Sequence, residues 1–181
     1  MATQNVPLTS AHRTFSLRLP AAGLLIRFAL VPVAVAICYL FSWQFLRYWT
    51  AEFNLGLDLL AGIHLQRVSF DQVLWKGVLY RYQIACTMAD VWCGAIPLLW
   101  NWRRSLFRNL ILLAGFAVGI FTLNVLRLSF SDVLFAAGFP WNVAHNVIGG
   151  ISYFIVWVWL WTSPYSPVFA YRSSVQSAFS K

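Results

Sequence analysis

Cys86, Arg127 and His145 are the three side chains in this sequence whose types, taken together, could carry out a reaction. A cysteine thiolate is a nucleophile, and a neighbouring imidazole can take the thiol proton. A nearby guanidinium can stabilise the oxyanion of a tetrahedral intermediate. The set therefore fits acyl transfer from a peptide bond to the thiol. Release of the acyl group to water would be proteolysis, and release to an external amine would be transpeptidation.

The composition of the chain indicates a membrane protein. Of its 181 residues, 60% are hydrophobic, 18% are aromatic and only 10% are charged, whereas a soluble domain carries about 25% charged residues. The formal net charge is +8, but the basic residues lie at the ends of apolar runs and in short loops, where they set topology in a bilayer. A nucleic-acid-binding face would need a continuous basic surface, so we expect a lipid bilayer and no nucleic acid as partner.

The apolar runs predict an all-α polytopic membrane protein with one domain over 24–162. Basic tails at 1–23 and 163–181 flank this domain, and three arginines lie in the short stretch 101–108. Positive charge of this kind favours the cytoplasm, so we expect both tails and this loop on the cytoplasmic side. Four transmembrane helices are expected, over 24–45, 84–100, 110–128 and 143–161.

The stretch between the first two predicted helices is too polar to cross a bilayer, and the expected topology places it outside the cell. Phe53 to Leu65 has apolar residues at mostly helical spacing, which predicts a short amphipathic helix at the membrane interface. Val68 to Tyr82 alternates and is interrupted at Lys76-Gly77, which predicts a small β-hairpin.

This topology predicts that the three reactive residues meet. Cys86 opens the second predicted helix at the outer face and Arg127 ends the third, and the midpoint between them falls near Leu106 in the basic loop. His145 opens the fourth predicted helix after a short outer loop over 129–144. All three should therefore lie at the outer membrane boundary.

Other polar residues are candidate supporting residues: Asp90, Asn124, Asn142 and Asn146. A carboxylate one helical turn below Cys86 is unfavourable in a membrane unless it is paired or near water. We expect Asp90 to pair with Arg127 or to orient His145, with an acid solvated at the helix end as the alternative. Asn124 lies three residues before Arg127 and shares its helix face.

The remaining histidines and cysteines carry less weight as site residues. His64 lies in the outer segment and is a rival general base, without a predicted helix to fix it. Cys38 and Cys93 are expected to be packing residues with free thiols. None of the cysteines belongs to a metal or redox spacing pattern, so no metal and no cofactor is expected.

In order and spacing, three motifs resemble the exosortase/archaeosortase family. They are Cys86-Thr87 at a predicted helix start, Asn124-Val125-Leu126-Arg127 near a helix end, and His145 followed by Gly149-Gly150. The resemblance covers roughly Tyr80 to Trp161. Met88 departs from it, because the family often has glycine two positions after the cysteine. The short chain resembles a compact, core-only member.

The resemblance implies a membrane-embedded cysteine protease or transpeptidase of the prokaryotic inner membrane, with its active site at the extracytoplasmic face. It implies that Cys86 is the nucleophile, Arg127 the transition-state stabiliser and His145 the general acid or base. The implied substrates are exported proteins with a C-terminal sorting tail, made of a motif, a transmembrane helix and a basic end. The implied acceptor is water or an envelope component linked to lipid or polysaccharide.

Two other classes of protein remain alternatives on the sequence alone. The first is a small non-enzymatic membrane subunit that assists assembly, in which Cys86→Ala would leave function intact. The second is an intramembrane protease that cuts within a helix rather than at its outer margin.

Overall fold

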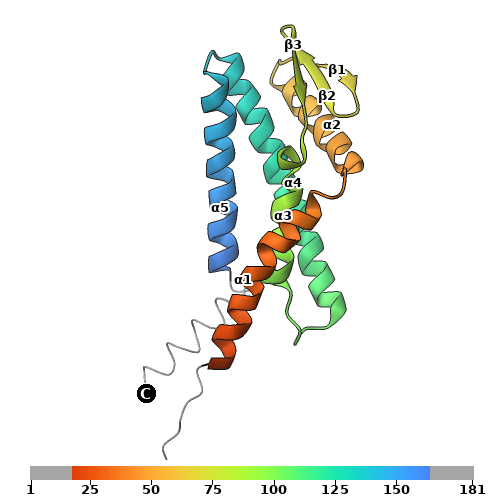
Figure 1. The fold of residues 1–181 in the computed structure, drawn as a ribbon. Helices are drawn as coiled ribbons and strands as arrows, with labels where there is room; N and C mark the ends of the chain where they lie inside the picture. The colour runs from red at the N-terminus through yellow and green to blue at the C-terminus, as the bar shows by residue number, and fades with distance from the viewer. Residues whose placement is uncertain (1–17, 164–181) are drawn as a thin grey trace, which may run out of the picture.

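The computed structural model describes residues 18–163, so most of the two predicted tails, 1–23 and 163–181, lies outside the described residues. Three short antiparallel strands form one sheet in the order β1-β2-β3. The elements are α1 (Arg18–Cys38), α2 (Gln44–Leu60), β1 (Gln66–Ser69), β2 (Gln72–Trp75), β3 (Val78–Arg81), the 3₁₀-helix η1 (Ile84–Thr87), α3 (Ala89–Leu99), α4 (Leu106–Ala136), the π-helical turn η2 (Asn142–Val147) and α5 (Ile148–Thr162) (Figure 1).

The helices form an elongated bundle with the sheet at one end. The sheet and α2 lie at the end where α4 turns into α5, and the loop between α3 and α4 lies at the opposite end (Figure 1). Helix α1 packs on α3, and α2 packs on α4. An apolar core joins α3, α4 and α5, with Leu99, Leu113 and Leu160 among its buried members.

Two helical runs are long and apolar enough to cross a membrane. They are the 31-residue α4 and the 21-residue run Asn142–Thr162, in which η2 continues into α5. The predicted helix over 84–100 is instead the four-residue η1 followed by the 11-residue α3. Helix α3 alone rises about 16 Å, about half the thickness of a bilayer core.

The first predicted helix, 24–45, also differs from the structure, because α1 ends at Cys38. The indole N–H of Trp43 donates a hydrogen bond to the Cys38 carbonyl oxygen at 2.7 Å. This bond satisfies one of the carbonyl groups that a helix end leaves without a partner. Trp43 itself has a φ of 50°, and the chain turns there into α2.

The third predicted helix was expected to end at 128, and the structure shows that this boundary is wrong. Helix α4 continues through the predicted outer loop to Ala136, so Arg127 lies nine residues before its end. The polar residues that suggested a loop have partners: Ser129 Oγ donates to Asp58 at 2.6 Å, and Ser131 Oγ donates to the Arg127 carbonyl at 2.9 Å. The helix ends only before Gly138, which has a φ of 96°.

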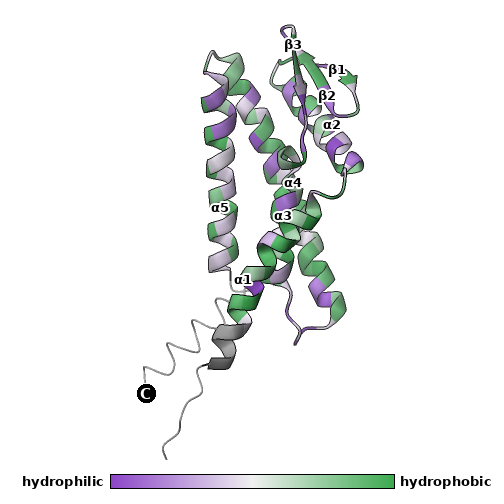
Figure 2. Cartoon of the chain, in the orientation of Figure 1, coloured by the Kyte–Doolittle hydropathy of each residue, from purple (hydrophilic) through white to green (hydrophobic). Residues whose placement is uncertain are grey.

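Helix α2 begins at Gln44, well before the predicted start at Phe53, and its polar side faces the protein. Its buried residues are Arg47, Thr50, Ala51, Asn54 and Asp58. Its exposed side carries large apolar residues: Phe45, Trp49, Phe53 and Leu60. Coloured by hydropathy, the hydrophilic residues concentrate towards the sheet end, on α2, the sheet and the neighbouring parts of α4 and α5, while α1 is mostly hydrophobic (Figure 2).

The predicted hairpin is present, and a third strand extends it. Lys76 and Gly77 form the turn between β2 and β3 with φ angles of 47° and 80°, as a two-residue type I′ hairpin turn requires. Asp71, between β1 and β2, fastens the sheet to α2 through an ion pair with buried Arg47, and also bonds Arg81 at 2.9 Å. Burial alone would raise the pKa of Asp71, but the hydrogen bonds from Arg81 and Ser69 and the two positive charges lower it below its ordinary value.

Candidate functional site

Cys86 lies in η1, where the chain leaves the sheet and enters α3. Its backbone carbonyl oxygen accepts a hydrogen bond from the Asn124 side chain at 2.7 Å. Met88, which follows two positions later, is fully buried and has a φ of 54° and a ψ of 22°. This left-handed conformation favours glycine and strains a larger residue. The family resemblance expects glycine at position 88, and the left-handed backbone at this position favours glycine.

Cys86 and His145 line one cavity of about 80 Å³. Other residues on its walls come from the sheet region, from α4 and from the start of η2, and include Trp75, Tyr80, Arg81, Tyr82, Asp132 and Trp141. The structure thus brings two of the three predicted residues to one space. That space is large enough for a few small groups and is bounded largely by aromatic rings.

His145 lies in the π-helical turn η2. Single π-turns inside helices often occur at functional sites. The imidazole stacks on Trp141, with ring centroids 4.6 Å apart and ring planes 8° from parallel. Its Nδ1 atom is buried and has no hydrogen-bond partner among the described residues. Buried polar atoms without partners are rare in folded proteins, so this ring is fixed in position and still has a free nitrogen.

Arg127 is buried in α4 beside the same region. Its Nη2 donates to Asn124 Oδ1 at 3.2 Å, while its Nε–H is buried and without a partner in the described part of the chain. Cys86 and His145 are both close enough to interact with its charge. Within residues 18–163 the guanidinium makes no ion pair, so it retains the capacity to bind an anion.

Gly149 makes room for this guanidinium. A Cβ atom at Gly149 would lie 2.9 Å from Arg127 Nη1, a distance at which one of the two must move, whereas a Cβ at Gly150 would meet nothing within 4 Å. At Gly149 the packing partner is the arginine of the candidate site.

Asp90 has partners other than those predicted. Its carboxylate lies within hydrogen-bonding distance of the Tyr39 hydroxyl at 3.2 Å and of the Tyr153 hydroxyl at 3.2 Å. It also accepts from the Val91 backbone N–H at 2.9 Å, at the first turn of α3, where a negative charge is favoured by the helix dipole. Within the described residues it bonds neither Arg127 nor His145. The Tyr153 hydroxyl also reaches the Ala85 carbonyl at 2.9 Å, which fixes the residue next to Cys86.

Sequence reasoning missed a buried acid pair behind the cavity. Asp132 lines the cavity and accepts from Asn54 Nδ2 at 2.9 Å, and the same amide donates to Asp58. The two carboxyl groups are thus held by one amide and lie close enough to interact, an arrangement that disfavours ionisation of both. Burial raises the pKa of Asp58. The available sequence signal was that Asp58 and Asp132 are two of only five acidic residues in the chain.

The other predicted candidates lie apart from this arrangement. Asn142, Asn146 and His64 are exposed. Cys38 and Cys93, on the packed helices α1 and α3, are free cysteines, as is Cys86. In the part of the chain that the structure describes, no group of three or more histidine, cysteine or acidic residues is arranged to hold a metal ion.

Comparison of the chain with protein-family models, with curated proteins and with solved structures gives no match. A functional assignment therefore rests on the residues and their geometry.

Proposed function

We propose that this chain is a membrane-embedded cysteine protease or transpeptidase of the exosortase type, with Cys86 as nucleophile, His145 as general base and acid, and Arg127 as oxyanion stabiliser. The observation that carries the proposal is the shared cavity of Cys86 and His145, with Arg127 joined to the Cys86 backbone through Asn124. Two atoms that the reaction would use, His145 Nδ1 and Arg127 Nε, are among the buried side-chain atoms that lack partners in the described residues.

The proposed reaction assigns each group a step. His145 takes the thiol proton, and the Cys86 sulfur attacks the carbonyl carbon of the scissile peptide bond. The free Nε–H of Arg127 binds the oxyanion that forms. When the intermediate collapses, the C–N bond breaks and His145 returns the proton to the leaving amine. Water or an acceptor amine then attacks the thioester and releases the thiol.

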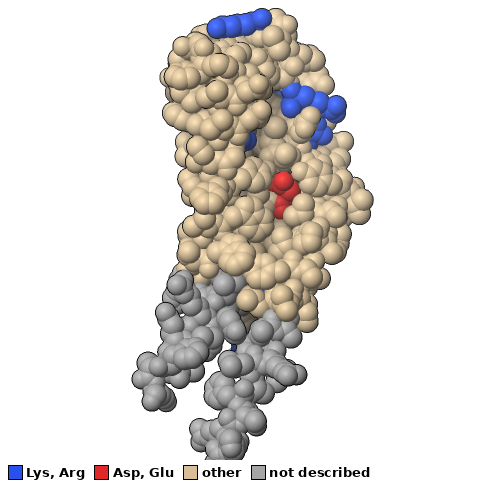
Figure 3. All heavy atoms as spheres, turned by 60° about the vertical axis from the view of Figure 1, so that its left-hand side comes forward, with Lys and Arg blue, Asp and Glu red and all other residues tan. Residues whose placement is uncertain are grey.

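The exposed apolar surface supports placement in a bilayer. Helix α2 buries Arg47, Asn54 and Asp58 and exposes Trp49 and Phe53, which is the reverse of the pattern for a helix in water. On the face shown in Figure 3, basic groups appear towards the sheet end and one acidic patch lies midway, and most of the surface below is uncharged. Such a surface matches hydrocarbon rather than solvent.

We propose four membrane crossings: α1, η1 with α3, α4, and η2 with α5. Helix α4 and the run through α5 are long enough individually, and η1 with α3 together reach about 24 Å. The loop over 101–108, with three arginines, then lies in the cytoplasm, and the cavity lies towards the extracytoplasmic face of a prokaryotic inner membrane.

The proposed substrate is an exported protein whose C-terminal tail ends in a transmembrane helix and a basic segment. Such a helix would run beside the bundle and present its outer margin at the level of Cys86. The proposed acceptor is water or an amine of an envelope component linked to lipid or polysaccharide. The substrate class comes from the family resemblance.

Co-expression with a tail-bearing substrate tests the proposal. Cys86→Ala is expected to abolish processing, measured as the disappearance of the shortened product on immunoblots. Cys93→Ala is the matched control, because it removes a half-buried thiol seven residues further along the same segment and should leave processing intact. Processing by Cys86→Ala would overturn the nucleophile assignment and favour a non-enzymatic subunit. Mass spectrometry of the product locates the cut, and a cut within the apolar helix would indicate an intramembrane protease instead.

A further inference from the structure

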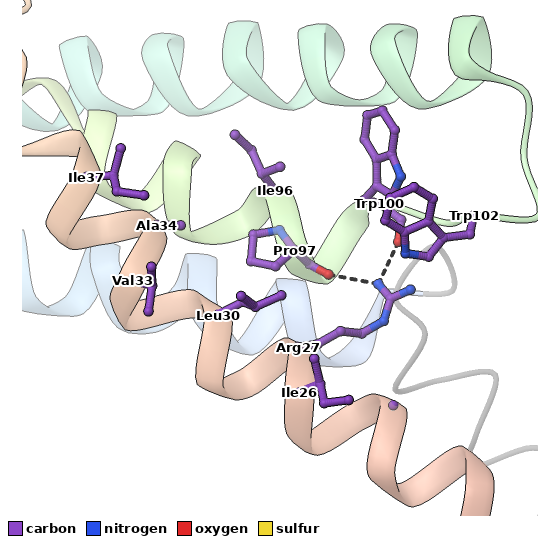
Figure 4. Close-up of a pocket in the computed structure, with 11 residues that line it drawn as sticks. Ile26, Arg27, Leu30, Val33, Ala34, Ile37, Ile96, Pro97, Trp100 and Trp102 are labelled. Carbon is purple, nitrogen blue, oxygen red and sulfur yellow. Dashed lines mark hydrogen bonds between the residues drawn. The ribbon is translucent and has the colours of Figure 1, made fainter.

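An apolar groove with one cationic end is formed by α1 and α3, towards the end of the bundle opposite the sheet. Its volume is about 580 Å³. Leu30, Val33 and Ile37 of α1, each about half exposed, line one side of the groove, and Ile96 of α3 lines the other (Figure 4). The groove is therefore bounded by hydrocarbon along its length.

Arg27 is fixed at the end of this groove by the last turn of α3. Its Nη1 donates to the carbonyl oxygens of Pro97 at 2.8 Å and Trp100 at 2.5 Å (Figure 4). These carbonyl groups lie at the helix end, where they lack intrahelical partners. The Nε and Nη2 donors of the guanidinium make no hydrogen bond within the described residues, so a fixed positive charge with free donors faces the groove end.

Two tryptophans lie at the same end of the groove. The indole Nε1 of Trp100 is buried and has no partner among residues 18–163, and Trp100 and Trp102 both line the groove. The Trp100 indole N–H is enclosed by protein, so the free guanidinium donors of Arg27 are the ones suited to an oxyanion such as a phosphate. The groove thus has the two properties of an amphiphile site, a long apolar part and a short anion-binding part.

We propose that this groove binds one anionic phospholipid, with its phosphate at Arg27 and one acyl chain lying between α1 and α3. The proposed topology supports this occupant, because the Arg27 end lies beside the basic loop 101–108, in the cytoplasmic leaflet, where anionic lipids concentrate. A peptide is disfavoured, because the apolar walls offer no partners for its backbone amides. A second copy of the chain would leave the Arg27 charge buried without a counter-ion.

The bound lipid would join two helices that meet at the end of the bundle opposite the sheet. Its acyl chain would fill the space between α1 and α3, and its phosphate would neutralise the charge that closes the last turn of α3. The inference rests on membrane insertion and not on the catalytic assignment. Lipid binding and substrate processing therefore succeed or fail separately.

Native mass spectrometry of the full chain, purified and exchanged into mixed micelles of phosphatidylglycerol and phosphatidylcholine, tests the proposal. Wild-type protein should retain one phosphatidylglycerol, in preference to phosphatidylcholine. Arg27→Gln should lower that preference by roughly fivefold, the value of one cation near an anionic headgroup. Arg108→Gln is the matched control, because it removes an exposed arginine near the same end and should leave the preference unchanged.

A second variant separates loss of the site from loss of folding. Leu30→Trp fills the groove from the exposed face of α1 and leaves Arg27 in place, so it should abolish the retained lipid while the circular dichroism spectrum stays that of wild type. Equal retention of the two lipids by wild-type protein would overturn the proposal. Equal losses in Arg27→Gln and Arg108→Gln would also overturn it, because they would indicate a diffuse charge effect.

Discussion

The two ends of the molecule bury different kinds of side chain. At the end with the sheet, the buried set includes Asp58, Asp71, Asn124 and Arg127, joined by hydrogen bonds and ion pairs. At the other end, the core of α3, α4 and α5 is apolar, with Leu99 and Leu160 fully enclosed. In a chain with only 10% charged residues, burying charges at one end is energetically unfavourable unless they are paired. The comparison indicates that apolar packing holds the helices together at one end, while the other end is held by polar contacts and contains the proposed site.

Among the variants that compare the two ends, Arg127→Met should have the largest effect on activity. Arg127→Met should lower the rate of processing by about 10²- to 10³-fold, the usual loss for one oxyanion donor. The thermal midpoint should stay near that of wild type, because the substitution removes a buried charge that has no ion-pair partner in the described residues. A single-turnover assay in membranes measures the rate. Arg103→Gln in the basic loop is the control, and equal losses in both would contradict the division between the two ends.

The apolar end should respond in the opposite way. Leu99→Ala should lower the free energy of unfolding by about 2–4 kcal/mol, through lost burial and the cavity left behind. Activity per folded molecule should be unchanged, since Leu99 lies far along α3 from Cys86. Unfolding in detergent with added denaturant measures the stability. A specific activity that fell with stability intact would show that the two ends are not separable.

Gly149 offers a finer test, because it shares its helix with a matched neighbour. In Gly149→Ala the new methyl group should displace the end of the Arg127 side chain and lower the processing rate by roughly ten- to a hundredfold, the loss expected for a misplacement of about 1 Å. Stability should change little, since the end of a flexible side chain can move. Gly150→Ala, where a Cβ meets open space, should process at the wild-type rate. Equal processing rates in Gly149→Ala and Gly150→Ala would show that the position of the Arg127 guanidinium does not affect the reaction.

The smallest expected effect is a pH dependence of the unfolding free energy that arises from Asp71, the residue that attaches the sheet to α2. The pKa of Asp71 is lowered in the folded protein, so its contribution to stability is present above the unfolded pKa, about 3.9. That contribution is lost as the pH falls through the lower, folded value. Wild-type unfolding free energy should therefore drop below about pH 4 by on the order of 1 kcal/mol, and Asp71→Asn should remove that part of the drop. If Asp71→Asn had the same pH profile of stability as wild type, the ion pairs of Asp71 with Arg47 and Arg81 would not be the source of the drop.

Hydropathy and charge predicted much of the arrangement. They gave the two long apolar helices, the polar segment with its hairpin, and an order of elements in which Cys86 and His145 could share a cavity. They placed the end of α4 eight residues too early, because Ser129 and Ser131 look like loop residues when their partners are unknown. Those partners, Asp58 and the α4 backbone itself, are set by tertiary contact.

The buried acid pair and the role of Asp90 were hidden for a related reason. Asp132 was assigned to a loop, so nothing suggested that it could meet Asp58 from a helix far earlier in the chain. Asp90 was expected to pair with Arg127 or to orient His145. Its actual partners, Tyr39 and Tyr153, come from the first and last helical regions. Single-sequence patterns describe each helix face but do not specify which faces meet.

The reversed polarity of α2 also has a consequence for the order in which the protein is made. The partners that hydrogen-bond its inward side, Ser129 and Asp132, lie 71 and 78 residues later in the chain. When α2 leaves the ribosome, these partners have not been synthesised, so Asn54 and Asp58 must remain in contact with water. Helix α2 can enter its final place only after α4 has been inserted. Helix α2 is therefore synthesised early but packs late. A chain truncated before α4 should leave α2 accessible to proteases.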